Sequence, residues 1–227
     1  MSFKEFVKSL SNKGAEGEMI KTVFISLATS FLLLAFMYFL SFRYSPDFIP
    51  KFGFYILFAI LSYALILPSV RYVRAYREFG CMSGMMIGMT IGMVAGFLPG
   101  FYIGSTNGMF VGSVFGMGIG IFLGIWNGKC CGIMGIMEGV MAGFMGGLMG
   151  AMTAVMMLND NLKAGGIVVF LVSGFILFGL NYMIYKETRE MEIKAKDDDF
   201  FTIILSFLLT ALTLLIMVLG PRSLLFQ

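Results

Sequence analysis

Long apolar runs separated by short polar segments dominate the chain and predict seven transmembrane helices. A helix needs about 20 predominantly apolar residues to cross the hydrocarbon core of a bilayer. The runs that meet this length are Met19–Phe42, Phe52–Val70, Cys81–Ile103, Gly108–Trp126, Ile133–Leu158, Ile167–Tyr185 and Phe201–Gly220. The segments between them carry turn and charge signals, among them Arg71–Glu78, Ser105-Thr106-Asn107, Asn159–Lys163 and Lys186–Asp199. We therefore expect an all-α fold, a polytopic helical bundle in the membrane.

The composition supports a membrane location. Hydrophobic residues make up 59% of the 227 residues, and charged residues only 13%. Soluble domains carry about 25% charged residues, so a soluble chain of this composition could not cover its surface with polar groups. The net charge of +3 is small and the basic residues lie near helix ends. We expect the lipid bilayer as a partner, and no nucleic acid.

The distribution of Lys and Arg predicts the orientation, because loops on the cytoplasmic side carry an excess of basic residues. With the N-terminus inside, twelve basic residues fall on the cytoplasmic side and four outside. The outer four are Arg43, Lys51, Lys163 and Arg222, and the inner twelve are Lys4, Lys8, Lys13, Lys21, Arg71, Arg74, Arg77, Lys129, Lys186, Arg189, Lys194 and Lys196. We expect the N-terminus in the cytoplasm and the C-terminus outside.

Four segments follow from these patterns. Residues 1–18 form an N-terminal cytoplasmic segment whose apolar face, with Phe3 and Phe6, either lies along the inner leaflet or belongs to a frayed basic tail. Residues 19–80 hold two transmembrane helices, and residues 81–158 form a Gly/Met-rich three-helix core. Residues 159–227 hold two more helices, with a charged cytoplasmic loop at 186–199.

Glycine recurs at every fourth position from Gly84 through Gly132, and the span that follows continues with Gly135, Gly139, Gly143, Gly147 and Gly150. In lipid, helices gain little from hydrophobic burial against each other, and small residues let their backbones approach closely. An exposed glycine in a helix costs about 1 kcal/mol relative to alanine, so close packing has to offset that cost. The pattern predicts a glycine-zipper core. Its expected contact residues are Gly84, Gly88, Gly92, Gly112, Gly116, Gly120, Gly139 and Gly143.

Methionines form stripes on two of these spans. At 100° per residue, the methionines of 134–156 fall on one face with Glu138, and the glycines fall on the opposite face. Met82, Met85, Met86, Met89 and Met93 form a second stripe. Methionine either fills irregular gaps beside glycine or supplies soft thioether ligands suited to copper(I). The four flanking spans contain few methionines, so a general bias in composition does not explain the stripes.

Other candidate ligands lie near the predicted cytoplasmic ends of these spans. A carboxylate inside a span costs at least about 2.5 kcal/mol, so Glu138 either pairs with Lys129 or balances a bound cation. Cys81, Cys130 and Cys131 either form a cytosolic exchange site or are inert thiols, and a structural disulfide is not expected on this reducing side. The predicted metal path consists of Met85, Met89, Met93, Met137, Met141, Met145 and Met149.

The series Met85-x-x-x-Met89-x-x-x-Met93, combined with Gly112-x-x-x-Gly116-x-x-x-Gly120, resembles the pattern of eukaryotic Ctr-type copper transporters over residues 81–157. The resemblance implies a copper(I) path lined by thioether sulfurs. The chain departs from that pattern in having seven spans instead of three, and it lacks the methionine-rich extracellular tail and the histidine-cysteine terminus.

We therefore expect the protein to transport copper(I), or to deliver it to a partner such as a soluble metal chaperone. Two alternatives remain. One is a structural subunit that packs through its glycine faces against its own copies or other membrane subunits, and the other is a glycine-lined oligomeric pore for another solute. An enzyme is not expected, because the chain has no histidine and no nucleophile–base pair. Neither haem nor a nucleotide is expected, since the usual haem ligand and a phosphate-binding loop are missing.

Overall fold

The chain is an all-α bundle with seven helices that are long and apolar enough to cross a membrane. The computed structural model describes residues 15–40, 48–75, 79–129, 132–188 and 199–221. Most of the predicted N-terminal segment and of the charged loop at 186–199 lies outside these residues. The helices are α2 (Ala15–Leu40), α3 (Phe48–Ala75), α4 (Cys81–Asn107), α5 (Met109–Gly128), α6 (Gly132–Met156), α7 (Leu162–Thr188) and α8 (Asp199–Leu219), and the short 3-10 helix η3 (Met157–Asn159) follows α6.

Several helix ends differ from the prediction. Helix α3 continues through Ala75, so the predicted loop at Arg71 is wrong, because neither Pro nor Gly follows there to end the helix. Helix α4 also continues through the predicted turn at residues 105–107, where the Ser105 hydroxyl donates to the Tyr102 carbonyl oxygen at 2.7 Å. The chain turns only at Gly108, whose φ of 105° favours glycine.

Consecutive helices run in opposite directions, as seven spans require. At one end of the bundle, the end of α3 meets the start of α2, where Arg71 Nη1 donates to Thr22 Oγ1 at 3.0 Å. At the same end, the last turn of α7 meets the start of α4, where Ser83 Oγ donates to Glu187 Oε1. We call this the Arg71 end.

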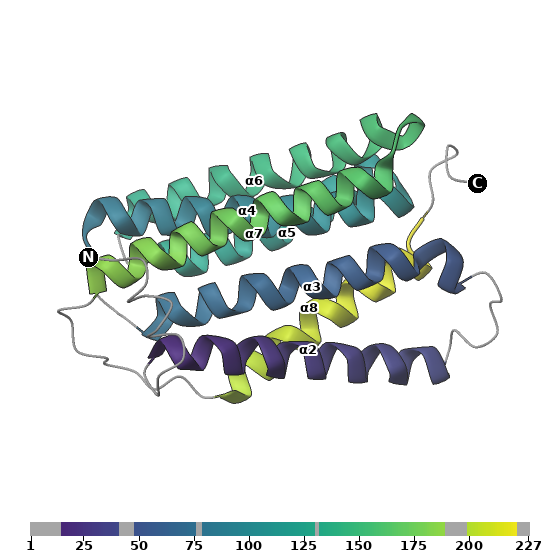
Figure 1. Cartoon of the computed structure of the whole chain (residues 1–227). Coiled ribbons are helices and arrows are strands. Elements are labelled where there is room, and N and C mark those ends of the chain that lie inside the picture. The colour runs from purple at the N-terminus through teal and green to yellow at the C-terminus, as the bar shows by residue number, and fades with distance from the viewer. Residues whose placement is uncertain (1–14, 41–47, 76–78, 130–131, 189–198, 222–227) are drawn as a thin grey trace.

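The opposite end holds the end of α4 and the end of α8. There Asn107, which is almost fully buried, donates from Nδ2 to the carbonyl oxygen of Ile216 at 2.9 Å. The start of α7 also lies here, because a Cβ on Gly166 would be 3.4 Å from the ring of Phe101. We call this the Asn107 end. The colours of Figure 1 show the same alternation of directions.

Helices α4, α5 and α6 pack against one another more extensively than any other helices described. A Cβ on Gly96 would lie 2.9 Å from the carbonyl oxygen of Gly143, and one on Gly116 would lie 2.7 Å from that of Gly96. Cβ atoms in proteins essentially never come closer than 3.0 Å to such atoms. The backbones of these three helices therefore touch directly.

The predicted contact glycines occupy this interface. A Cβ would come within 3.0 Å of the backbone of a neighbouring helix at Gly88, Gly92, Gly112, Gly116, Gly120, Gly139 and Gly143. Gly84 is also buried.

A second group of helices, α2, α3 and α8, lies on the other side of the molecule from α4, α5 and α6 (Figure 1). Here side-chain hydroxyls join the helices. Ser206 of α8 lies 3.1 Å from the hydroxyl oxygens of both Thr29 and Ser30 of α2, and 3.3 Å from that of Ser26. Ser26, Ser30 and Ser206 are fully buried. Small hydroxyl residues thus hold the helices of this group together, as glycine does in α4, α5 and α6.

The glycine interface gives the first prediction. Replacing Gly143 by Ala places a Cβ against the backbone of Gly120 and Ile121, which cannot move away as a flexible side chain could. We expect this substitution to lower the free energy of unfolding by roughly 1–3 kcal/mol or more, measured as a lower melting temperature in detergent. The matched control is Gly118→Ala on α5, because a Cβ there meets nothing within 4 Å. The control should leave stability unchanged or raise it by up to about 1 kcal/mol, and equal losses in both variants would contradict this account of the core.

The hydroxyl cluster gives the second prediction. Ser206→Ala removes the atom that Ser26, Thr29 and Ser30 share, and it should destabilise the α2–α8 contact by about 1–2 kcal/mol. The same melting measurement tests this. Thr153→Ala serves as the control, since that hydroxyl donates only to the Met149 carbonyl of its own helix. A control as damaging as Ser206→Ala would mean that the interhelical bonds contribute nothing of their own.

Candidate metal site

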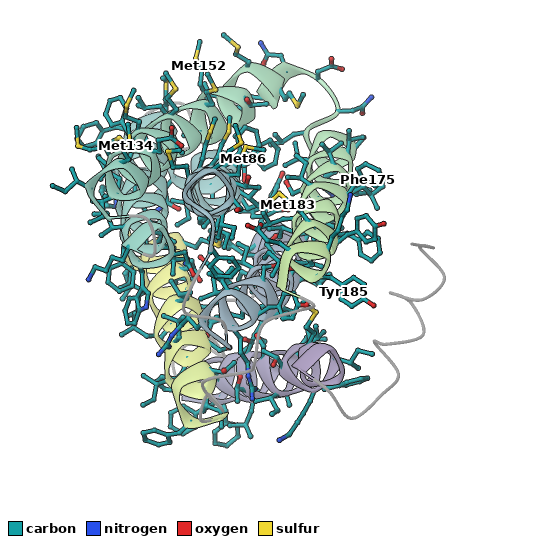
Figure 2. The ribbon with its side chains drawn as sticks, turned by 90° about the vertical axis from the view of Figure 1, so that its left-hand side faces the viewer. Met86, Met134, Met152, Phe175, Met183 and Tyr185 are labelled. Carbon is teal, nitrogen blue, oxygen red and sulfur yellow. The ribbon has the colours of Figure 1, made fainter. Side chains whose placement is uncertain are left out.

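The methionines of α6 form its outward face. Small residues, Gly and Ala, make up all of the buried positions of this helix. The outward positions carry exposed methionines: Met134, Met137, Met141, Met145, Met149, Met152 and Met156. Figure 2 shows Met134 and Met152 on the outer side of α6, pointing away from the other helices. The close backbone contacts explain this, because they leave no room for a long side chain inside.

Helix α4 carries the second row of exposed methionines, Met82, Met86, Met89 and Met93. This row lies beside α6, because a Cβ on Gly146 of α6 would meet the carbonyl oxygen of Met93. The two methionine rows therefore belong to neighbouring helices of the same three-helix core.

The outward faces of the other helices have a different composition. Exposed large residues are Phe, Leu and Ile on α2, such as Phe31 and Leu32, and Phe, Leu, Ile and Val on α7 and α8. Every exposed methionine among the described residues lies on α4, α5 or α6. All outward faces meet the same requirement to be apolar in a bilayer, so that requirement does not explain why two of them carry methionine.

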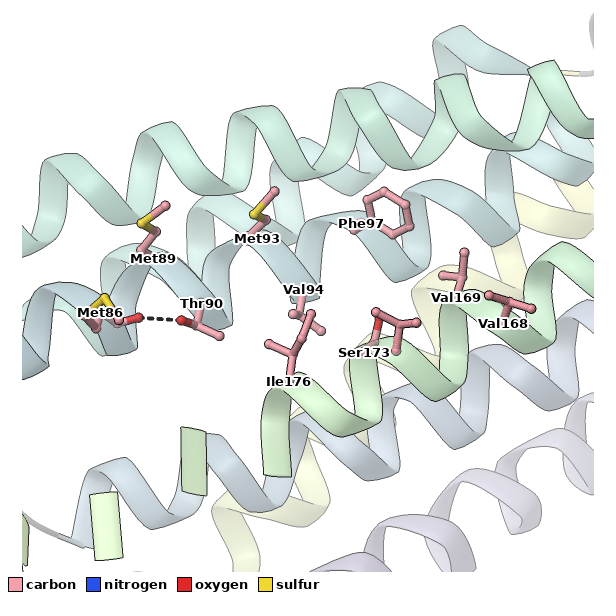
Figure 3. Close-up of a pocket in the computed structure, with 11 residues that line it drawn as sticks. Met86, Met89, Thr90, Met93, Val94, Phe97, Val168, Val169, Ser173 and Ile176 are labelled. Carbon is pink, nitrogen blue, oxygen red and sulfur yellow. Dashed lines mark hydrogen bonds between the residues drawn. The ribbon is translucent and has the colours of Figure 1, made fainter. Parts of the chain in front are cut away.

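A groove of about 470 Å³ lies between α4 and α7. The α4 side contributes Met86, Met89 and Met93, and the α7 side contributes Val168, Val169 and Ile176 among others (Figure 3). The groove has little polar lining: Thr90 donates its hydroxyl to the Met86 carbonyl oxygen at 2.7 Å, and Ser173 is the other hydroxyl. Three thioethers thus face one apolar space that α7 screens on one side.

The groove brings together two of the three α4 methionines that the sequence predicted as ligands. Met89 and Met93 line it, whereas Met85 is half-buried and does not. Met86, which was not among the predicted ligands, takes the third place. Met85 follows the strict spacing of four residues, but at 100° per residue Met86 lies closer than Met85 to the mean direction of Met89 and Met93. The position of α7 on that side makes Met86 a lining residue of the groove.

Glu138 lies on the methionine face of α6 and is half-buried. No hydrogen bond or ion pair joins it to another residue in the described part of the chain. The ion pair between Glu138 and Lys129, one of the two alternatives, is therefore not formed among these residues. This carboxylate therefore stands alone among thioether side chains, at the Arg71 end of the span. A cation close to such a carboxylate would compensate its charge within the span.

The remaining predicted ligands cannot be placed. Cys130 and Cys131 lie outside the described residues, and so does the side chain of Cys81, at which α4 begins. In the parts of the chain that are described, no three side chains of His, Cys, Asp or Glu come together. A metal ion held by the described residues would take its ligands mainly from methionine sulfur.

Comparison with known proteins identifies no relative of this chain: no protein-family model, curated protein or solved structure matches it. The described features with distinctive chemistry are the two methionine faces and Glu138.

Proposed function

We propose that the protein binds a soft monovalent metal ion, copper(I), and moves it along the methionine faces of α4 and α6. The observation that carries the proposal is the confinement of exposed methionine to the core helices while the other outward faces carry Leu, Ile, Phe and Val. Leucine is as apolar as methionine and would face lipid equally well. What methionine adds is a thioether, a soft and neutral ligand that favours copper(I) over hard cations.

The length of the α6 face suits movement across a membrane. Met134 and Met156 are 22 residues apart, about 33 Å along a helix at about 1.5 Å per residue, close to the hydrocarbon thickness of about 30 Å. Seven thioethers along this distance provide a series of similar sites. Conduction needs sites that bind tightly enough to admit the ion and weakly enough to release it, and thioethers without a charge meet this condition.

Charge also supports a cation as the cargo. Thioethers are neutral, so they leave the charge of the ion uncompensated, and Glu138 supplies one carboxylate at the Arg71 end. From the excess of Lys and Arg we expect this end in the cytoplasm. Cys81, Cys130 and Cys131 are close in sequence to the same end, where their thiolates would exchange the ion with a soluble metal chaperone.

An assembly role through the glycine faces has less support. Most glycines of α4, α5 and α6, with exceptions such as Gly118, already contact backbone within the same chain, for example Gly124 with Gly139 and Gly120 with Gly143. They cannot at the same time pack against another protein. The same occupation argues against a pore lined by these glycines.

The metal proposal gives the third prediction. A variant with Leu in place of Met86, Met89, Met93, Met141, Met145 and Met149 keeps similar side-chain volume and removes six thioethers. Protein purified under reducing conditions and loaded with copper(I) should hold less metal by elemental analysis. In competition with a copper(I) chelator, we expect its affinity to fall by about tenfold or more, which corresponds to about 1.4 kcal/mol.

The matched control replaces Met19, Met183 and Met217 by Leu. Met19 and Met217 are buried on α2 and α8, and Met183 is half-buried on α7. The control should keep its copper and, in vesicles, its rate of copper(I) uptake. Equal metal content in both variants would exclude the methionine faces as the binding site and leave packing as their only role.

A further inference from the structure

The α6 face is an incomplete site in a single chain. Helix α6 packs mainly against α4 and α5, through the Gly and Ala residues that lie on the side opposite its methionines. The groove on α4 has α7 as an opposite wall, but Met141 and Met145 have none. An ion bound there would have sulfur on one side and lipid on the other, and a cation in contact with hydrocarbon is strongly unfavourable.

We propose that a second copy of this chain covers the α6 face and that copper(I) is held between the two α6 helices. The inference rests on the proposed function, since the metal is part of the interface. Copies with the same membrane orientation are related by a two-fold axis along the membrane normal, and such an interface uses the same patch on both partners. Residues of equal number therefore face each other at equal depth, and each ion gains thioethers from two sides.

The negative charge of Glu138 favours a second copy with bound metal over a second copy without metal. The two-fold axis brings Glu138 of one copy to the same depth as Glu138 of the other, and neither has another partner among the described residues. Two carboxylates at close range in a medium of low dielectric constant repel each other. Copper(I) bound between the two copies offsets part of this repulsion and adds thioether bonds to both. The metal-free protein should therefore be mainly monomeric and the copper-loaded protein dimeric.

The other features of α6 agree with this interface. The glycine faces are used inside each chain, so the methionine face is the side of α6 that remains for association. Methionine side chains are flexible and adapt to an opposing surface. The face extends over the full span, which allows two parallel helices to touch along their whole length.

The experiment measures association in vesicles, with two populations of the full chain carrying different fluorescent tags and diluted in lipid. Energy transfer is followed as copper(I) is added under reducing conditions, and bound copper is measured in the same sample. We expect copper(I) to strengthen association by about 5- to 150-fold, a common range for coupling between two binding events. By reciprocity, dilution of the protein in lipid should weaken copper binding by the same factor.

Two variants separate the metal from the charge. Met141→Leu with Met145→Leu should abolish the copper-dependent rise in energy transfer, whereas Met217→Leu, buried on α8, should leave it intact. Glu138→Gln should associate more strongly than the unmodified protein when copper is absent, because the repulsion is gone, and copper should then raise association by a smaller factor through the thioethers that remain. A Phe175→Ala control on the outward face of α7 should behave like the unmodified protein.

Different failures have different meanings. Copper(I) that binds tightly while energy transfer stays at the monomer level overturns the dimer and leaves the proposed function standing. A chain that binds no copper(I) overturns both. Association that occurs without metal and is unaffected by Glu138→Gln or the methionine pair would place the interface elsewhere, and it would equally overturn this inference.

Discussion

Direct contact between helix backbones is the constraint on which this structure depends. Hydrocarbon surrounds the helices, so burying apolar side chains between them brings little gain, and dispersion at short range has to hold them together. In α4, α5 and α6 this contact is so close that a single added carbon would overlap with a neighbouring carbonyl, as at Gly96 against Gly143. The core therefore has no space for long side chains. Everything large on these helices has to point outward, toward lipid, toward another helix or toward a ligand.

The outward position of the methionines is thus a consequence of the core, but their chemistry is not. Any apolar residue would satisfy the outward faces of α4 and α6, and the outward faces of α2, α7 and α8 carry Phe, Leu, Ile and Val where these two carry methionine. Glu138 is also unexplained by packing, because close helix contact does not require a carboxylate without a partner, among the described residues, to lie between thioethers. Thioethers along a span and one negative charge near its end are together complementary to a soft cation.

The spans, the alternation of their directions and the glycine contacts were predictable because each depends on a short-range pattern: hydrophobic length, the period of the helix and the size of the smallest side chain. The helix ends at Arg71 and Asn107 were not, since polar residues there remain helical by bonding to neighbouring helices or to their own backbone. The role of Met86 in lining the groove was not predicted for a related reason. Its place in the groove depends on the position of α7, about 80 residues away along the chain. The cluster around Ser206 joins residues about 180 positions apart and had no signal beyond isolated hydroxyls in two apolar runs.

The two halves of the molecule use different means to hold helices together, and the difference bears on function. Hydroxyl groups fix α2 to α8 through directional bonds, which tolerate ordinary side chains on either side. Glycine contact has no direction, but it requires the surfaces of α4, α5 and α6 to match closely along their length. This close contact sets the separation of the two methionine rows. In the proposed transport, the three rotatable bonds of each methionine would let its sulfur follow the ion. Hydroxyl contacts between larger side chains would hold the helices further apart and would leave inward space into which methionines could turn. Placing the thioethers outside a glycine core keeps them available to a ligand at every depth of the membrane.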